Sequence, residues 1–142
     1  MAIITGDNSN NILKGTSEDD SIDALDGNDL LYGNEGNDTL IGGNGNDRII
    51  IGGGRAIANG GTDQDILFVN YNSSTSNITY SAFDPVNSSG TITNGAKNSV
   101  TYQSIEAFVI SGGFGNDDLR GRLLLGVKKG KMRSHSYRIS SF

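Results

Sequence analysis

The chain has 142 residues, no cysteine, a single histidine and a net charge of −5 at pH 7. The absence of cysteine excludes a disulfide-stabilised scaffold, and a zinc site would lack its usual ligands. No apolar run is long enough to span a membrane, so we predict no transmembrane segment, and we predict no nucleic-acid partner.

A nine-residue period runs from residue 6 to residue 68. In segments that begin at Gly6 and at every ninth residue thereafter, the eighth position is apolar throughout: Leu13, Ile22, Leu31, Leu40, Ile49, Ala58 and Leu67. The sixth position is an acid except at Asn11 and Ala56: Asp20, Asp29, Asp38, Asp47 and Asp65. Glycine recurs at the first and fourth positions. A period this short predicts a solenoid instead of a globular domain.

Nine residues suit one tight turn followed by a three-residue strand, such as 30–32 or 39–41. The middle side chain of each strand would face inward, because side chains alternate along a strand. Two repeats then complete one coil, so that equivalent residues two repeats apart lie above one another. We therefore predict an all-β fold, a right-handed parallel β-roll (a β-solenoid) of nonapeptide repeats with a β-rich capping or extension segment.

The predicted roll needs a source of stability in its turns. One large aliphatic side chain per repeat buries too little apolar surface to offset the ordering of the backbone. The aspartates also stack, Asp20 over Asp38 and Asp29 over Asp47, and stacked carboxylates repel unless a cation lies between them. Calcium suits this position because it accepts several oxygen ligands, backbone carbonyls included, whereas magnesium prefers a strict octahedron with retained waters. A metal-free solenoid and a disordered polar segment are the alternatives.

Residues 42–50, Gly-Gly-Asn-Gly-Asn-Asp-Arg-Ile-Ile, match the nonapeptide G-G-x-G-x-D-x-U-x in full. Residues 112–120 are a second full match, and residues 33–41 differ only at Asn34. On these motifs the chain resembles the haemolysin-type calcium-binding repeat family, also called repeats-in-toxin or RTX. The resemblance implies a parallel β-roll with calcium ions between successive turns. It also implies type I export without a cleaved N-terminal signal, to an extracellular location where calcium is plentiful.

The metal-site residues that we predict all lie in repeats: Asp20, Gly27, Asp29, Gly36, Asp38, Gly45, Asp47, Asp65 and Asp117. The glycines would let each turn aim its carbonyls inward. The best sites are expected where two acids stack. These pairs are Asp20 with Asp38, Asp29 with Asp47, and Asp47 with Asp65.

The sites are not expected to be equal. Asn11 is neutral where an acid is expected, so the first coil should bind weakly or act as a cap. Ala56 leaves Asp38 without an acid at the equivalent position two repeats further on. Asp26 and Asp63 lie in predicted turns, where they are either additional ligands or solvated turn formers.

Residues 69–111 leave the nine-residue phase and are predicted to form a β-rich extension or cap. Alternating Thr and Tyr residues favour several strands there: 78–80, 91–93, 99–102 and 107–110. Asn94-Gly95 is a hairpin turn signal between two of them. A ligand-binding insertion is the alternative interpretation. Residues 112–120 follow as a further nonapeptide repeat.

The segment 121–142 is an aberrant basic tail. Residues 1–118 hold all 16 acids and four of the 11 basic residues, a net charge of −12, and the seven other basic residues follow. The repeat pattern also stops directly after the full match at 112–120. One hypothesis is a frameshift or a truncation in the gene. The alternative is a genuine basic tail that binds anionic surfaces.

No catalytic residues are predicted. His135, the only histidine, lies in the basic tail, so a Ser-His-Asp triad has little support. We expect a non-enzymatic calcium-ion-binding module of a secreted protein, one that folds on binding calcium. The alternatives are a cell-surface adhesin or interaction module with the roll as its stalk, and the C-terminal roll of a secreted enzyme. Besides calcium, the expected partners are a cell surface or other domains of a parent protein.

Overall fold

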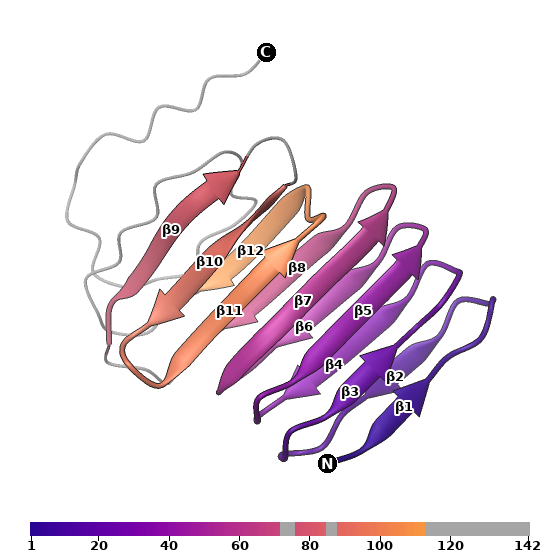
Figure 1. Ribbon diagram of the computed structural model, residues 1–142, viewed down its shortest axis with the longest axis horizontal. Helices are drawn as coiled ribbons and strands as arrows, with labels where there is room; N and C mark the ends of the chain where they lie inside the picture. The colour runs from indigo at the N-terminus through magenta and orange to yellow at the C-terminus, as the bar shows by residue number, and fades with distance from the viewer. Residues whose placement is uncertain (72–75, 85–87, 113–142) are drawn as a thin grey trace.

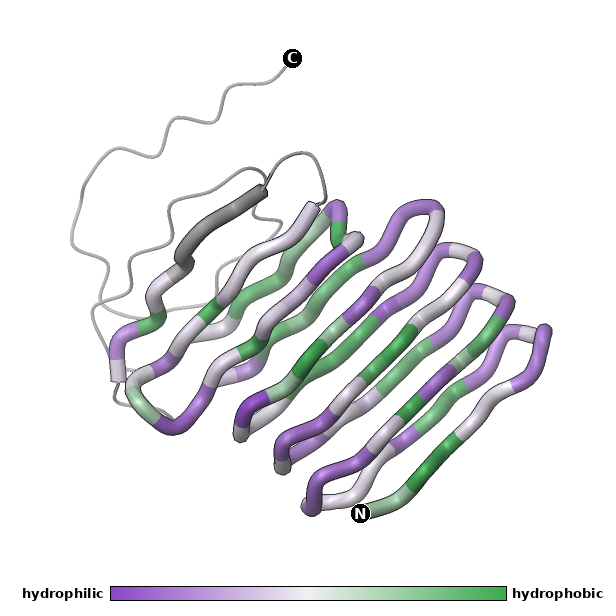
Figure 2. The backbone as a smooth tube through the Cα atoms, viewed as in Figure 1, coloured by the Kyte–Doolittle hydropathy of each residue, from purple (hydrophilic) through white to green (hydrophobic). Residues whose placement is uncertain are grey.

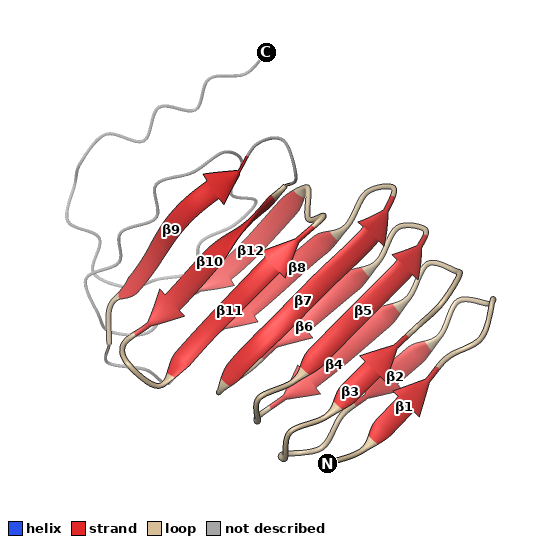
Figure 3. Ribbon diagram, in the orientation of Figure 1, coloured by secondary structure: helices blue, strands red, loops and turns tan. Residues whose placement is uncertain are grey.

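The computed structural model describes residues 1–71, 76–84 and 88–112, with the backbone alone for 80–84. All regular structure in these residues is β (Figure 3). The strands are β1 (Ile3–Thr5), β2 (Ile12–Lys14), β3 (Ser21–Asp23), β4 (Leu30–Asn34), β5 (Thr39–Asn44), β6 (Arg48–Ile51), β7 (Arg55–Thr62), β8 (Ile66–Asn70), β9 (Ile78–Asp84), β10 (Ser89–Asn94), β11 (Asn98–Gln103) and β12 (Ala107–Ser111). In these segments we find no helix with the length and apolarity to cross a membrane.

The strands form two sheets that face each other (Figure 1). One sheet has seven strands in the order β1-β3-β5-β7-β11-β10-β9, and the other has five in the order β12-β8-β6-β4-β2. From β1 to β8 the chain alternates between the sheets, and neighbouring strands in each sheet run parallel. The structure is therefore a parallel β-roll with two short strands per coil, which confirms the predicted fold class.

The register of the strands confirms the predicted stacking. Leu13 pairs with Leu31, and Leu31 pairs with Ile49. In the other sheet Leu40 pairs with both Ile22 and Ala58. From Ile22 onward these inward-facing side chains are fully buried, while the turns at both edges of the roll are hydrophilic (Figure 2). The eighth position of the repeat therefore builds the core.

The expectation of three-residue strands is wrong beyond β3, because all strands from β4 to β8 are longer than that. The extra length brings a second inward-facing position into the core. Ile51 in β6 and Val69 in β8 occupy this position and are at most 1% exposed. The core is thus wider than one side chain per repeat.

Between β8 and β12 the chain makes an insertion into one coil. Ala107 in β12 pairs with Ile66 in β8, a far larger sequence separation than that between Leu13 and Leu31 in an ordinary coil. Within this insertion β9 and β10 pair antiparallel and extend the seven-stranded sheet, and β10 turns into β11 around Gly95. β11 then stacks parallel on β7. The chain returns to the roll through β11 and β12, which together form its last described coil.

The outer faces of the two sheets differ in polarity. On the five-stranded sheet, Tyr32, Ile50, Phe68 and Val109 form one row in register, and all four are partly exposed. The corresponding row on the seven-stranded sheet is mixed, in register order: Asp23, Ile41, Asn59 and Gln103. One face of the roll is therefore distinctly more apolar than the other.

Candidate functional site

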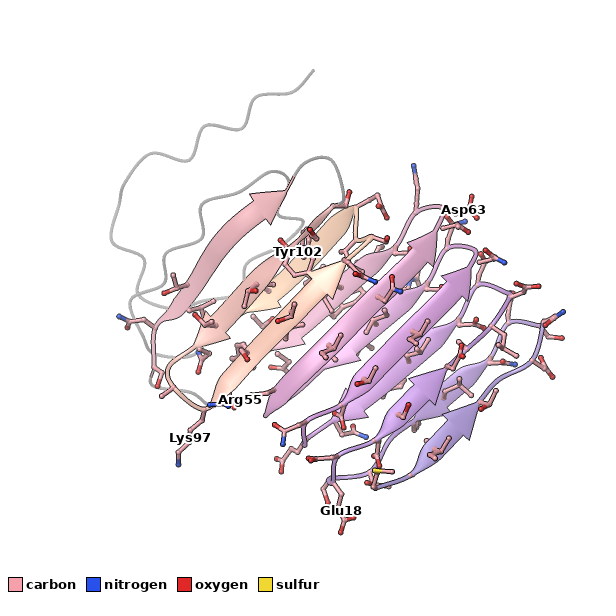
Figure 4. All side chains as sticks on the ribbon, in the orientation of Figure 1. Glu18, Arg55, Asp63, Lys97 and Tyr102 are labelled. Carbon is pink, nitrogen blue, oxygen red and sulfur yellow. The ribbon has the colours of Figure 1, made fainter. Side chains whose placement is uncertain are left out.

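The aspartates at the sixth position form two columns, one in each row of turns. Asp29, Asp47 and Asp65 belong to the row that also holds Asp63, and Asp20 and Asp38 to the row with Glu18 and Arg55. The labelled Asp63 lies at one edge of the roll, and Glu18 and Arg55 lie at the opposite edge (Figure 4). All five column aspartates are at most 4% exposed: Asp20, Asp29, Asp38, Asp47 and Asp65. Buried carboxylates of this kind need partners, because desolvation of a charge is costly.

One oxygen of each carboxylate has a structural partner. The Oδ1 atom accepts a hydrogen bond from a backbone N–H one coil earlier, which belongs to Ala2 for Asp20, to Asn11 for Asp29 and to an aspartate for the other three. The distance from Asp20 N to Asp38 Oδ1 is 2.9 Å, and those from Asp29 to Asp47 and from Asp47 to Asp65 are both 2.8 Å. The prediction that stacked carboxylates only repel each other is therefore incomplete. An amide lies between each pair and stabilises half of the carboxylate.

The other oxygen has no such partner in most of the column. The Oδ2 atoms of Asp29, Asp38, Asp47 and Asp65 are buried and accept no hydrogen bond from any described residue. Asp20 differs, because its Oδ2 accepts the backbone N–H and the hydroxyl of Thr16 at 2.5 and 2.8 Å. Four buried acceptors thus face a position where a donor or a cation is expected.

The pKa values of the column aspartates reflect this shortage of hydrogen-bond donors to their buried oxygens. Burial raises the pKa of the Asp38 and Asp47 carboxyls to about 6 and that of Asp65 to about 7, and neighbouring acids raise them further. The hydrogen bonds from the preceding aspartate amides act in the opposite direction but are outweighed. By contrast, amide hydrogen bonds from Thr16 and Ala2 lower the pKa of Asp20. Neutralisation by a proton or a cation would therefore stabilise three of the buried groups.

Backbone carbonyls lie beside Oδ2 atoms of the column aspartates. A Cβ atom placed on Gly42 would collide with both Asp47 Oδ2 and the carbonyl oxygen of Gly60, one coil further on. A Cβ atom placed on Gly15 would likewise lie 2.8 Å from the carbonyl oxygen of Gly33 and 2.9 Å from Asp20 Oδ2. The first-position glycine thus leaves room for a carboxylate oxygen and a carbonyl oxygen at one place. Such an all-oxygen donor set suits calcium.

The fourth-position glycines add a second row of carbonyls. Gly27, Gly36 and Gly45 have φ angles of 130°, 117° and 118°, which side chains rarely adopt. The carbonyl oxygen of Gly27 faces Gly45, and that of Gly36 faces Gly54 in the same way. In residues 1–71, 76–84 and 88–112, no three acidic or histidine side chains converge on one point. A metal ion in these turns would therefore depend on carbonyls as well as carboxylates.

One repeat replaces the acid and the glycine together. Ala56 takes the sixth position and Ile51 the first, and both are buried, at 3% and 0% exposure. Asp38 therefore has no acid above it in the next coil, as the sequence indicates. Here the column loses its carboxylate, and apolar packing takes its place in the core.

Comparison with known protein families gives a direct match. The family model described as the RTX calcium-binding nonapeptide repeat (4 copies) matches residues 5–40, 23–57 and 109–123. The chain carries RTX calcium-binding nonapeptide repeats. These repeats bind calcium ions, so the cofactor of the RTX roll is calcium, as predicted. The repeat family is a structural calcium-binding module and not a catalytic one. No curated protein matches the chain significantly.

The RTX turns bring the predicted site residues together to different extents. Asp29, Asp38, Asp47 and Asp65 lie in the columns with a free oxygen, and the predicted glycines line the same turns. Asp26 accepts a hydrogen bond from Asn44 Nδ2 at 2.6 Å and so belongs to the outer surface of the turn. Asp63 is exposed. Asp117 and the tail 121–142 lie outside the described residues.

A second ladder, at the fifth position of the RTX repeat, was not predicted from the sequence. Asn10 Oδ1 accepts the N–H of Asn28 at 2.8 Å, and Asn28 Oδ1 accepts that of Asn46 at 2.7 Å. Asn46 Oδ1 then accepts the N–H of Gln64 at 3.0 Å. The recurrence of amide side chains two repeats apart was the available signal.

Glu106 was also missed as a member of an acid column. Its Oε2 accepts the N–H of Asp65 at 2.9 Å. This bond is equivalent to the one in which Asp65 Oδ1 accepts the N–H of Asp47. No periodic signal exists for Glu106, because it lies outside the nine-residue phase that ends at residue 68.

Proposed function

We propose that this RTX roll is a non-enzymatic calcium-ion-binding module that folds when calcium binds between its stacked turns. The observation that carries the proposal is the set of buried aspartate oxygens without a hydrogen-bond partner. The proposed ligands are carboxylates of the columns and carbonyls of the turn glycines: Asp20, Gly27, Asp29, Gly36, Asp38, Gly45, Asp47, Asp65 and, in the last repeat, Asp117.

Bound calcium would supply the positive charge that the columns lack. The chain's own residues hold the oxygens in place before the ion arrives. Each Oδ1 is fixed by an amide of the neighbouring coil, so the carboxylate cannot rotate freely, and in Asp38, Asp47 and Asp65 the Oδ2 stays beside the first-position glycine. Preorganisation of this kind lowers the entropic cost of binding. Because the ligands come from successive coils, binding and coil stacking are coupled.

We propose an extracellular location for this module, as part of a secreted protein exported by a type I system. RTX repeats are typical of secreted proteins. Calcium modules outside the cell commonly have dissociation constants of about 10⁻⁴ to 10⁻³ M. A roll with such affinity would remain unfolded in the cytosol and fold after export.

A calcium titration followed by far-UV circular dichroism tests the proposal. The β signal is expected to rise cooperatively with calcium and to stay unchanged with magnesium. The variant Asp47→Asn removes a carboxylate in the middle of one column and is expected to raise the calcium midpoint at least tenfold. Asp23→Asn is the matched control, because Asp23 lies on β3 outside both columns. Equal β content with chelator and with millimolar calcium would refute the proposal.

A second candidate function is a calcium-dependent interaction module at a cell surface. It is favoured by the apolar outer row on the five-stranded sheet, where Ile50 and Phe68 are only partly buried. Binding of the calcium-loaded chain to intact cells should be lost in Ile50→Ser. Ile41→Ser is the control, since Ile41 occupies the same repeat position on the more polar sheet. Equal loss in both variants, or no binding at all, would speak against this function.

A further inference from the structure

We propose that Asp65, Ser104 and Glu106 form a further calcium site, at the junction where the roll meets the inserted strands. Ser104 and Glu106 lie outside the nonapeptide repeats, in the turn between β11 and β12. The inference rests on the proposed calcium-dependent function and extends it to residues that no repeat motif includes.

Glu106 occupies the next position of the acid column after Asp65. The strand register pairs Ala107 with Ile66, so the residues before them, Glu106 and Asp65, are also neighbours. Glu106 Oε2 accepts the Asp65 N–H at 2.9 Å. Asp65 Oδ1 accepts the Asp47 N–H at 2.8 Å in the same way. Glu106 therefore continues the column by one more step.

The carbonyl oxygen of Ser104 lies beside Asp65 Oδ2, next to Gly60. A Cβ atom on Gly60 would collide with the carbonyl oxygen of Ser104 and with Asp65 Oδ2. One coil earlier, a Cβ atom on Gly42 would collide with the carbonyl oxygen of Gly60 and with Asp47 Oδ2. Ser104 thus takes the place of the first-position glycine. Its φ angle of 51° is unusual for a serine and shows that the turn adopts a constrained conformation.

The turn between β11 and β12 is short, yet it places oxygens of Ser104 and Glu106 beside Asp65. Gln103 pairs with Asn59 and Ala107 pairs with Ile66. Seven residue steps separate Asn59 from Ile66, but only four separate Gln103 from Ala107. The turn is thus shorter than an RTX turn, yet it places a carbonyl and a carboxylate beside Asp65.

The negative charge of the Asp65 carboxylate has no positive partner among the described residues. Asp65 is 1% exposed, and its Oδ2 has no hydrogen-bond partner among the described residues. The carboxylates of Glu106 and Asp63 are close enough to act on it electrostatically. In the part of the chain that the structure describes, the one ion pair joins the N-terminal amine to Glu18. A cation is therefore the expected source of neutralisation at this step.

Calcium stoichiometry, measured by isothermal titration calorimetry on the full chain, tests the site. Glu106→Gln keeps an oxygen that can accept the Asp65 N–H but removes the charge. We expect this variant to bind one calcium ion fewer per chain than the wild type, while retaining its β signal in saturating calcium. Glu35→Gln is the matched control and should keep the wild-type number, because Glu35 is an exposed turn residue outside both columns.

Unchanged stoichiometry in Glu106→Gln would overturn the site, and so would an equal loss in Glu35→Gln. A second measurement uses the wild-type chain. In saturating calcium, the ¹³C signal of the Glu106 side-chain carboxyl group should lie apart from the position of exposed glutamates, where the Glu35 signal is expected, and a Glu106 signal at that position overturns the site whatever the variant does. Failure of the proposed function looks different, because the wild-type chain would then bind no calcium.

Discussion

At the scale of single residues, the two oxygens of the column aspartates other than Asp20 have separate roles. Oδ1 of Asp47 is held by the N–H of Asp29, which orders the turn, while Oδ2 is left for a ligand. Asparagine at the same position would keep the first role and weaken the second. Asn11 heads one column through its backbone, because its N–H donates to Asp29 Oδ1 at 2.6 Å whatever its side chain is.

Without calcium, the buried carboxyls predict that the folded roll is more stable at low pH than at neutral pH. The pKa values of Asp38 and Asp47 are raised to about 6, and that of Asp65 to about 7, above the value of about 3.9 for an exposed aspartate. The folded roll therefore binds more protons than the unfolded chain. This stabilisation is complete below about pH 4 and is lost as the pH rises through 6 to 7.

In chelator, the β signal in circular dichroism should consequently grow as the pH is lowered from 7.5 to 5. In millimolar calcium the β signal should instead be larger at pH 7.5 than at pH 5, since calcium binds the ionised carboxylates. The triple variant Asp38→Asn, Asp47→Asn and Asp65→Asn should show neither dependence. A chelator profile that is flat in the wild type would contradict the buried-carboxyl account.

Leu25 offers a second test at the residue scale. It lies at the second position of its repeat with a φ angle of 73°, where Gly43 and Gly61 stand in the same column of turns. A leucine in this left-handed region is strained by about 1–2 kcal/mol. Leu25→Gly should therefore stabilise the calcium-loaded roll by about 0.5–1 kcal/mol, after the entropic cost of glycine.

Urea denaturation in saturating calcium would measure the effect of Leu25→Gly. Gly43→Ala provides the opposite control, because its Cβ would collide with the carbonyl oxygen of Leu25 at a φ angle of 113°. Loss of stability in Leu25→Gly would mean that the leucine side chain contributes more by packing than it costs in strain.

At the scale of elements, neighbouring turns are joined by two ladders that run in opposite senses. Column aspartates accept from the coil before them, whereas fifth-position amides accept from the coil after them. Each turn is thereby held on both sides, in addition to the parallel strand pairing. Only the aspartate ladder has buried oxygens to spare for an ion.

Asn46→Ala separates the two ladders. It removes the acceptor for the Gln64 N–H, so we expect a loss of about 0.5–1.5 kcal/mol in the free energy of unfolding. The number of bound calcium ions should not change, because Asn46 is exposed and its Oδ1 already accepts the Gln64 N–H. Denaturation and calorimetry on the same sample check both expectations. A drop in stoichiometry would place Asn46 among the ligands.

At the scale of the whole molecule, strands β1 to β8 pair only between successive coils, and residues 1–118 carry a net charge of −12. The stability of the roll is therefore a sum of neighbour interactions, and charge repulsion acts against all of them at once. Calcium opposes this repulsion in every coil that binds it. Cooperative folding along the roll is the expected consequence.

Small-angle X-ray scattering should detect this folding as a change in size. An unfolded chain of this length has a radius of gyration of about 39 Å, and a compact folded chain about 15 Å. Millimolar calcium should move the measured radius from the first value towards the second at pH 7.5, and equimolar magnesium should not. A radius that stays at about 15 Å without calcium, or at about 39 Å with it, would contradict calcium-triggered folding.

The spacing of residues by itself determined the roll, the inward ladder of Leu31 and Ile49, and the stacking of Asp29 with Asp47. These follow from local chemistry, since a nine-residue turn and strand can repeat only by stacking. Tertiary structure alone decided which carboxylate oxygen stays free, because that depends on an amide one coil away. It also decided that Ser104 and Glu106 join the column. Their neighbours there, Gly60 and Asp65, lie on the far side of the inserted strands in the sequence, a separation that no periodic pattern records.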